Sequence, residues 1–278
     1  MSSGDLGSSA KSASAPRSAV SVLRALATVT HRGDTLPAAE LGREVTVDRT
    51  ALAAYAKVCG FRVADTLPAT YPHVLSFPLQ MELLTRSDFP FPVLGLVHVA
   101  NRITVHRPVS ASETLALTVR AEDLRPHDKG RQFDVVSEAR VGDELVWQDW
   151  STYLRRSGSS SSDGAGERPE PPRPSAQWRV PADIGRRYAA VSGDSNPIHL
   201  YALTARAFGF PRAIAHGMWT KARCLAALEG RLPEAYTVEV RFKLPVLLPA
   251  KVGFSSDGGA FAVHDVRTGK PHLSGTVA

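Results

Sequence analysis

The chain has 278 residues, of which 43% are hydrophobic and 22% are charged. Such a composition can build a sizeable core, so a wholly disordered chain is excluded. A membrane span is not supported, because even the best early apolar run, residues 19–29, contains Arg24. The net charge of +6 favours anionic partners, but the basic residues are scattered and aromatic residues make up only 7%, which argues against nucleic acid.

The first half of the chain begins with a segment of low complexity. Residues 1–17 are rich in Ser, Ala and Gly and contain no apolar signal-peptide region, so we expect a disordered tail. Asp48 is placed to cap a helix over residues 49–59 that ends at Gly60. A second helix is expected within residues 71–86, with a kink or a late start because Pro78 lies inside it. β-rich runs follow at residues 97–105, 114–121 and 132–139.

A change of composition then divides the chain. Ser and Gly, followed by Pro, dominate residues 157–176, which is typical of a flexible linker between residues 18–156 and residues 177–278. Beyond it, Pro181 is suited to open a helix that ends near Gly193. A short helix is expected over residues 197–208 with Asn196 as its N-cap, and a long helix over residues 217–229. Strands are expected at residues 237–242, 251–254, 261–266 and 272–277.

The two halves are related by an internal repeat. Residues 55–60 align with residues 188–193 at an offset of 133, and residues 68–73 align with residues 211–216 at an offset of 143. The difference means that ten residues are present in the second copy and absent from the first. A long helix followed by antiparallel strands, twice over, predicts an α+β fold in which a curved sheet wraps each helix.

The segment at residues 192–199 is the densest polar cluster outside the linker. Asn196 as N-cap and Pro197 at the first helical position place His199 in a first helical turn and Asp194 on the preceding loop. The two side chains can therefore converge on one water, which a carboxylate orients and deprotonates while an imidazole passes the proton. The structural alternative is that Asp194 caps a turn and His199 is a satisfied core residue.

A second element follows at residues 214–218. Gly217 opens the long helix with an unpaired backbone N–H and no side chain, an arrangement that suits an oxyanion. Its alternative role is to permit a tight loop-to-helix turn. His216 could touch ligand, although a structural role is favoured because His73 occupies its place in the half that lacks the Asp/His segment.

At these residues the sequence resembles the MaoC-like and (R)-specific enoyl-CoA hydratase family of hotdog-fold proteins. The family signature is an aromatic residue followed by S-G-D-x-N-P-[hydrophobic]-H and a small residue six positions later, and A-H-G-M typically follows it. The positions that match are Tyr188, Val191, Ser192, Gly193, Asp194, Asn196, Pro197, Ile198, His199, Ala205 and residues 215–218.

The resemblance implies a double hotdog, with a degenerate copy at residues 18–156 and a catalytic copy at residues 177–278. It implies that Asp194 and His199 act on water, and that the Gly217 N–H binds the thioester carbonyl of a 2-enoyl substrate. The chemistry is then reversible hydration to an (R)-3-hydroxyacyl thioester, with no metal or redox cofactor called for. The segments that hold the substrate would contribute Ser192, Gly193, Asn196, His216 and Met218.

Two departures from the family pattern affect the expectation. Tyr201 stands where many relatives have an acidic residue. The first half lacks the counterpart of the Asp/His helix, so we expect one active site per chain and open space that tolerates long or bulky acyl chains.

Three other functions compete with this interpretation. Residues 193–195 look like the opening of a GDS-type esterase with Ser195 as nucleophile, but no late Asp-x-x-His follows. A hotdog thioesterase and a non-catalytic acyl-binding or partner-stabilising subunit remain as further alternatives. The isolated Cys59 and Cys224 indicate neither a disulfide nor a zinc site, and a reducing cytoplasm fits them best.

The expected partner is an acyl thioester of CoA or of acyl carrier protein, and the sequence does not choose between them. Neither nucleic acid nor a membrane is expected as a partner. Four basic residues flank the motifs and could meet phosphates, although each is better explained as an ordinary solvated charge: Arg206, Arg212, Lys221 and Arg223. The fused halves form an intrachain pseudo-dimer, and association of two such chains into a homodimer is left open.

Overall fold

The structure is a computed structural model that describes residues 34–157 and 173–278. The tail expected at residues 1–17 and most of the linker expected at residues 157–176 lie outside the described residues. No helix within the two described ranges is long and apolar enough to cross a bilayer.

The first unit contains two helices and five strands. Helix α2 (Arg49–Cys59) is capped as predicted, because Asp48 accepts from two N–H groups of its first turn and Gly60 ends it in the left-handed conformation. Helix α3 (Tyr71–Leu84) contains Pro78 but starts at Tyr71, so the late start was wrong. Eight of its residues are buried, and their packing outweighs the hydrogen bond that proline cannot donate. The strands are β1 (Glu40–Thr46), β2 (Leu96–Val105), β3 (Thr114–His127), β4 (Gly130–Val141) and β5 (Glu144–Arg156).

The second unit repeats this order with an insertion. It consists of β6 (Ala176–Val180), α4 (Ile184–Ser192), α5 (Pro197–Leu200), α6 (Ala202–Ala207), α7 (Gly217–Leu228), β7 (Tyr236–Phe242), β8 (Ala250–Asp257), β9 (Ala260–Asp265) and β10 (Pro271–Val277). The single helix expected over residues 197–208 is wrong, because Tyr201 is extended (φ −141°, ψ 149°) and separates α5 from α6. The Thr204 hydroxyl donates to the carbonyl of Pro197 at 2.6 Å, which satisfies a backbone acceptor at the break.

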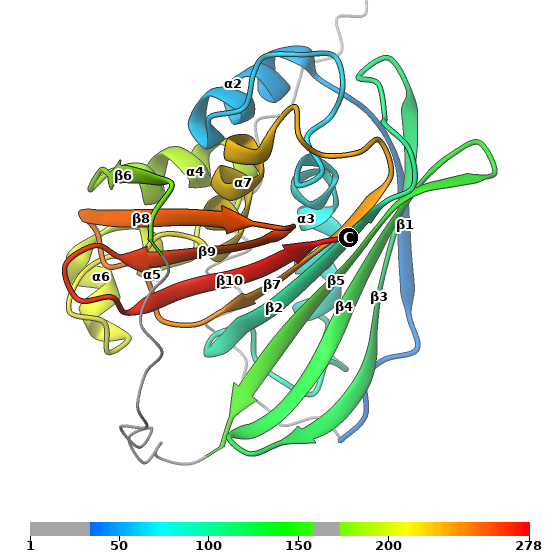
Figure 1. The fold of residues 1–278 in the computed structure, drawn as a ribbon. Coiled ribbons are helices and arrows are strands. Elements are labelled where there is room, and N and C mark those ends of the chain that lie inside the picture. The colour runs from blue at the N-terminus through cyan, green and yellow to red at the C-terminus, as the bar shows by residue number, and fades with distance from the viewer. Residues whose placement is uncertain (1–33, 158–172) are drawn as a thin grey trace, which may run out of the picture.

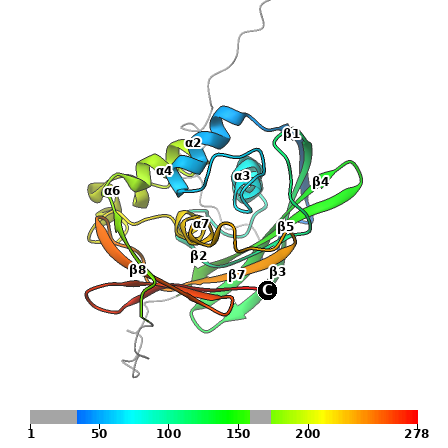
Figure 2. The same ribbon diagram turned by 45° about the horizontal axis from the view of Figure 1, so that its top comes forward.

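All ten strands join one antiparallel sheet in the order β1-β3-β4-β5-β2-β7-β10-β9-β8-β6. The order reads symmetrically outward from the β2–β7 pair, so each strand of one unit has a counterpart in the other. Figures 1 and 2 show α3 and α7 within the curve of the sheet, with α2 and α4 across its open side. This is the predicted double hotdog.

Strands β1, β5 and β6 were missed by the sequence patterns. β1 is an edge strand whose seven residues are all exposed or half-buried, so it lacks a clear apolar alternation. β5 carries Asp149, a charged residue that is nevertheless completely buried. β6 begins at Ala176, the residue at which we ended the expected linker.

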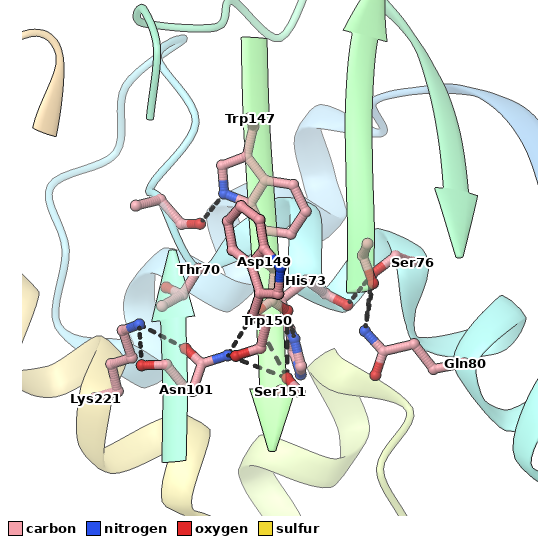
Figure 3. A network of polar contacts seen from close by, with 12 residues as sticks. Thr70, His73, Ser76, Gln80, Asn101, Trp147, Asp149, Trp150, Ser151 and Lys221 are labelled. Atoms are coloured by element: carbon pink, nitrogen blue, oxygen red, sulfur yellow. Dashed lines mark hydrogen bonds and ion pairs between the residues drawn. The ribbon is translucent and has the colours of Figure 1, made fainter. Parts of the chain in front are cut away.

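A buried polar network crosses the seam between the two units (Figure 3). Lys221 of α7 donates from Nζ to Asn101 Oδ1 of β2 at 2.5 Å and to the carbonyl of Val238 at 3.2 Å. The Asn101 amide in turn donates to Asp149, and His73 Nδ1 lies 2.6 Å from the other carboxylate oxygen. The network thus connects α7 of the second unit with β2, β5 and α3 of the first.

Candidate active site

The loop after α4 holds the Asp194 carboxylate in a defined position. Gly193 ends α4 with φ 78°, which turns the chain away from the helix axis. The N–H of Asp194 donates to Ser192 Oγ at 3.2 Å, and the N–H of Asn196 donates to Asp194 Oδ1 at 3.2 Å. The side chain of Asp194 is 32% exposed, so it can meet a small molecule from outside.

The His199 ring is oriented by the backbone of a distant loop. Asn196 caps α5 as predicted, accepting from the N–H of Ile198 at 3.4 Å. His199 Nδ1 lies 2.9 Å from the carbonyl of Ile214. Because a carbonyl only accepts, Nδ1 carries the hydrogen, and Nε2 of the neutral ring keeps a lone pair for a water molecule.

His216 completes the cluster by contacting both residues. Its ring stacks on that of His199 with centroids 3.7 Å apart, and its Nε2 donates to the backbone carbonyl of Asp194 at 3.0 Å. His216 Nε2 also lies 3.8 Å from Asp194 Oδ2. These contacts fit the supporting role favoured for His216, since it fixes the loop that carries the carboxylate.

The electrostatics of the cluster favour an ionised carboxylate beside neutral rings. Burial, the largest influence, raises the pKa of Asp194, but His216, His199 and the N–H of Asn196 together bring it below its ordinary value. Burial lowers the pKa of His199 and, aided by the neighbouring His199 ring, lowers that of His216 to about 3. At neutral pH the site therefore holds one negative charge and two neutral imidazoles.

Gly217 begins α7 directly after His216, as the sequence predicted. A Cβ at this position would lie 3.0 to 3.2 Å from three ring atoms of Phe242, so any other residue would require that ring or the helix to shift by a few tenths of an ångström. Among the hydrogen bonds of the described residues, none uses the Gly217 N–H, which lies at the positive end of the helix dipole. Met218 is buried in the core.

A metal ion is a second use to consider for the cluster, since one ligand atom from each of Asp194, His199 and His216 lies within 4.8 Å of the others. A metal needs ring lone pairs directed at one point about 2.0 to 2.1 Å from each nitrogen. His216 Nε2 carries a hydrogen that it donates to the carbonyl of Asp194, so this nitrogen has no lone pair for a metal. The arrangement fits a bound water better than a metal.

The flanking basic residues divide into exposed and buried ones. Arg206 and Arg212 are exposed as expected. The expectation for Lys221 was wrong, because its side chain is completely buried in the seam network. Arg223 lies over the Trp178 ring at 4.4 Å, which half-buries it.

The first unit contributes aromatic and imidazole groups that the sequence patterns did not indicate. Tyr153 and His73 lie near enough to Asp194 to interact with it electrostatically. His98 packs against Tyr153 and against Phe242, the ring beside Gly217, and its buried Nε2 has no hydrogen-bond partner in the structure. These residues come from α3, β2 and β5, so only the folded first unit brings them to the cluster.

The open space expected beside the active site stays a prediction, although the first unit has a hollow of its own. Between α2 and α3 the described chain has no counterpart of α5 and α6, and a hollow of about 300 Å³ lies over α2. Its lining includes Leu52, Ala53 and Ala56, with Arg49 and Arg62 also present. None of the lining residues belongs to the Asp194 cluster.

Comparison with known proteins places these features in a family. Residues 164–270 match the model of the MaoC like domain. The chain is 43% identical over 246 residues to 3-hydroxyacyl-thioester dehydratase X of Mycobacterium tuberculosis, covering 84% of this chain and 86% of that protein. It is 29% identical over 175 residues to enoyl-CoA hydratase ChsH3 of the same organism, covering 57% of this chain and 59% of that one.

Solved structures agree with the fold. The crystal structure of HtdX from M. tuberculosis superposes with a TM-score of 0.77 at 40% identity, covering 86% of this chain and 99% of that chain. A conserved hypothetical protein of M. tuberculosis described as a double hotdog superposes with a TM-score of 0.52 at 12% identity, covering 86% and 94%. The second likeness concerns the fold alone.

Proposed function

This chain belongs to the MaoC-like dehydratase family, and from that premise we propose that its second unit interconverts 2-enoyl and (R)-3-hydroxyacyl thioesters by adding or removing water. The observation that carries the proposal is the convergence of Asp194 and His199 beside the first turn of α7. One such cluster is present in the described residues, which agrees with one active site per chain.

Asp194 and His199 prepare the water for attack on C3. The ionised carboxylate and the lone pair of His199 Nε2 each accept a hydrogen bond from it, which fixes its orientation. One of the two groups takes the proton as the C3–O bond forms. The same assembly then returns a proton to C2, so both additions come from one side of the double bond and give a single stereoisomer.

The Gly217 N–H stabilises the charge that this attack creates. Addition at C3 pushes negative charge onto the thioester oxygen, and a backbone donor at the start of a helix is preorganised to receive it. In the reverse direction the same donor stabilises the enolate formed when the C2 proton leaves. Donors of this kind typically contribute about 10² to 10³ in turnover.

The acyl group arrives as a thioester, and the reaction occurs in the cytoplasm. Both cysteines are free and buried, which suits a reducing compartment.

His216 and Ser192 support the catalytic groups through the Asp194 backbone, while Gly193, Asn196 and Met218 shape the segments around them.

The test is a hydration assay with crotonyl-CoA on the full chain and on Asp194→Asn and His199→Ala. We expect loss of the enone absorbance without release of thiol, and a fall in kcat of at least about 10²-fold in each variant, as for removal of an acid–base group. Release of free thiol would identify a thioesterase instead. No change in either signal would favour a non-catalytic acyl-binding subunit.

A further inference from the structure

Large apolar side chains are exposed on the insertion that carries the catalytic histidine. Seven such side chains are exposed among the described residues, and three of them lie between residues 201 and 208. They are Tyr201 at 56% exposure, Leu203 at 79% and Phe208 at 36%. Exposed apolar side chains that cluster in this way usually mark a contact surface.

Three exposed arginines lie on or next to the same segment of the chain. Arg186 lies over the Tyr201 ring at 5.2 Å and donates to the carbonyl of Leu200 at 3.0 Å. Arg206 donates to the carbonyl of Pro211 at 3.3 Å, and Arg212 to that of Pro249 at 3.5 Å. None of the three forms an ion pair within the described residues, whereas Arg107, Arg120 and Arg125 of the first unit each contact at least two carboxylates.

The local sequence explains the unbalanced charge. Between residues 184 and 228, Asp194 of the active site is the sole acidic residue. We call the combined patch the α6 surface, comprising Arg186, Tyr201, Leu203, Arg206, Phe208 and Arg212. Leu203 and Arg206 are three positions apart and face away from the buried Ala205, so the apolar and basic groups share the outer side of α6.

The α6 surface adjoins the active site and has no counterpart in the first unit. Tyr201 follows His199 by two residues, and the N–H of Ile214 bonds to the carbonyl of Ile198, which ties α5 to the loop before Gly217. Figure 1 shows α6 at the end of the molecule opposite β1. A partner on this surface would therefore sit beside the catalytic histidine.

We propose that the α6 surface docks an acidic carrier protein that bears the acyl thioester, an inference that rests on the proposed function. Apolar side chains within a basic rim match a partner that is acidic and has apolar groups of its own. A CoA thioester supplies phosphates for guanidinium groups but no second protein surface to cover Leu203 and Phe208. The patch therefore favours the carrier-bound substrate over free CoA.

The experiment compares one acyl group on two carriers. Crotonyl thioesters of a type II acyl carrier protein and of CoA are assayed with the full chain and with the variants Leu203→Ser and Arg206→Glu. We expect KM for the carrier-protein substrate to rise about 10-fold or more, with kcat unchanged and with both constants for crotonyl-CoA within twofold. The matched control is Arg43→Glu on β1, the edge strand of the first unit. It should change neither kcat nor KM for either thioester.

Two further measurements keep the outcomes separate. Binding of the unacylated holo carrier protein, followed by fluorescence anisotropy, should weaken in the two variants and with added salt. An equal loss of kcat/KM on both thioesters, or no loss on either, would overturn the docking proposal. A change of oligomeric state of the variants in ultracentrifugation would also overturn it, because the patch would then be a contact between copies of this chain. Absence of hydration with both wild-type substrates would instead refute the proposed function, and the anisotropy measurement would still decide the docking.

Discussion

Gly217 lies where a side chain of any size would push against Phe242. We predict that Gly217→Ala lowers kcat by about 10- to 100-fold, because a shift of the first turn of α7 by a fraction of an ångström displaces the backbone donor from the developing oxyanion. The fold should survive, since the helix itself favours alanine. Steady-state kinetics with crotonyl-CoA measures the effect.

The double variant Gly217→Ala/Phe242→Leu serves as the control for this steric argument. Replacing the ring removes the atoms that the new methyl group would meet, so part of the lost kcat should return. A double variant no better than the single one would show that contact with Phe242 is not the reason for glycine at this position.

His98 should make the stability of the protein depend on pH. Burial and the nearby His73 lower the pKa of His98 to about 3, whereas an unfolded histidine titrates near 6.5. Between these values the unfolded state binds the extra proton, so the stability that neutral His98 contributes is complete above about pH 6.5 and is lost as the pH falls. Each such proton changes the free energy of unfolding by about 1.4 kcal/mol per pH unit.

The variant His98→Phe tests this dependence, because Tyr153 and Phe242 already surround the ring with aromatic groups. We expect its free energy of unfolding to fall less steeply than that of the parent between pH 6.5 and 5, as measured by urea titration. Identical slopes in the two proteins would contradict the buried, neutral state of His98.

The role of a residue could be predicted where it depends on neighbours in the sequence. It could not be predicted where it depends on residues that only the fold brings close. Asp48 and Asn196 were identified as helix caps because a cap depends on its immediate neighbours. His98 gave no such signal, since its surroundings come from β5 and β7. Lys221 was mistaken for a solvated charge because lysine is rarely buried and its acceptors are far away in the sequence.

At the scale of elements, the seam network anchors α7 against the first unit. We predict that Lys221→Met destabilises the protein by about 1 to 3 kcal/mol, because Asn101 Oδ1 and the carbonyl of Val238 lose their buried donor. Methionine keeps the length of the apolar stem, so packing is largely preserved. The free energy of unfolding at pH 7 measures the change.

A matched control lies on the same seam outside the hydrogen bonds of Lys221. Thr104 and Thr237 hydroxyls are 2.9 Å apart across β2 and β7, and Thr237→Val should cost less than about 1 kcal/mol, since both groups are only partly buried. Equal losses in the two variants would indicate general weakness of the seam and not a specific role of the lysine.

The patterns of the elements succeeded where periodicity was strong. The strands at residues 237–242 and 272–277 were found almost to the residue, as β7 and β10. The break between α5 and α6 was not found, because nothing in the side chain of Tyr201 forbids a continuous helix. It depends on the extended backbone there and on the hydroxyl of Thr204.

At the scale of the whole molecule, we predict that long acyl thioesters are turned over at least as well as the four-carbon substrate. The hollow over α2 is lined partly by the connection between α2 and α3, which contains no helix, and apolar residues form part of its wall. The comparison is kcat/KM for enoyl-CoA substrates of four and of twelve or more carbons.

A bulky side chain in the hollow tests whether this space accommodates the acyl chain, without altering the catalytic residues. Ala53→Trp should reduce kcat/KM for long substrates and spare the four-carbon one, whereas Ala54→Trp on the exposed side of α2 should leave both unchanged. A strict preference of the parent for the shortest substrate would count against the prediction. An undiminished rate on long chains in Ala53→Trp would place the acyl tail elsewhere.

The repeat offsets predicted from the sequence alone that the chain consists of two similar units, the first of which lacks the Asp/His helix. Sequence similarity between the copies survives at helix ends and turns, where glycine and proline are constrained, and these positions suffice to align them. The offsets do not specify which strands meet at the centre of the sheet. That pairing depends on hydrogen bonds between β2 and β7, whose residues lie more than 100 positions apart.

The continuity of the sheet through β2 and β7 makes each half a scaffold for the other. In a lone copy, β2 or β7 would be an edge strand with unpaired N–H and C=O groups, which could pair with a strand of another molecule. The first unit therefore has a structural task that does not depend on chemistry, because its strand β2 covers the β7 edge of the second unit. Since both units belong to one chain, this cover is always present at the same local concentration as the edge that it protects.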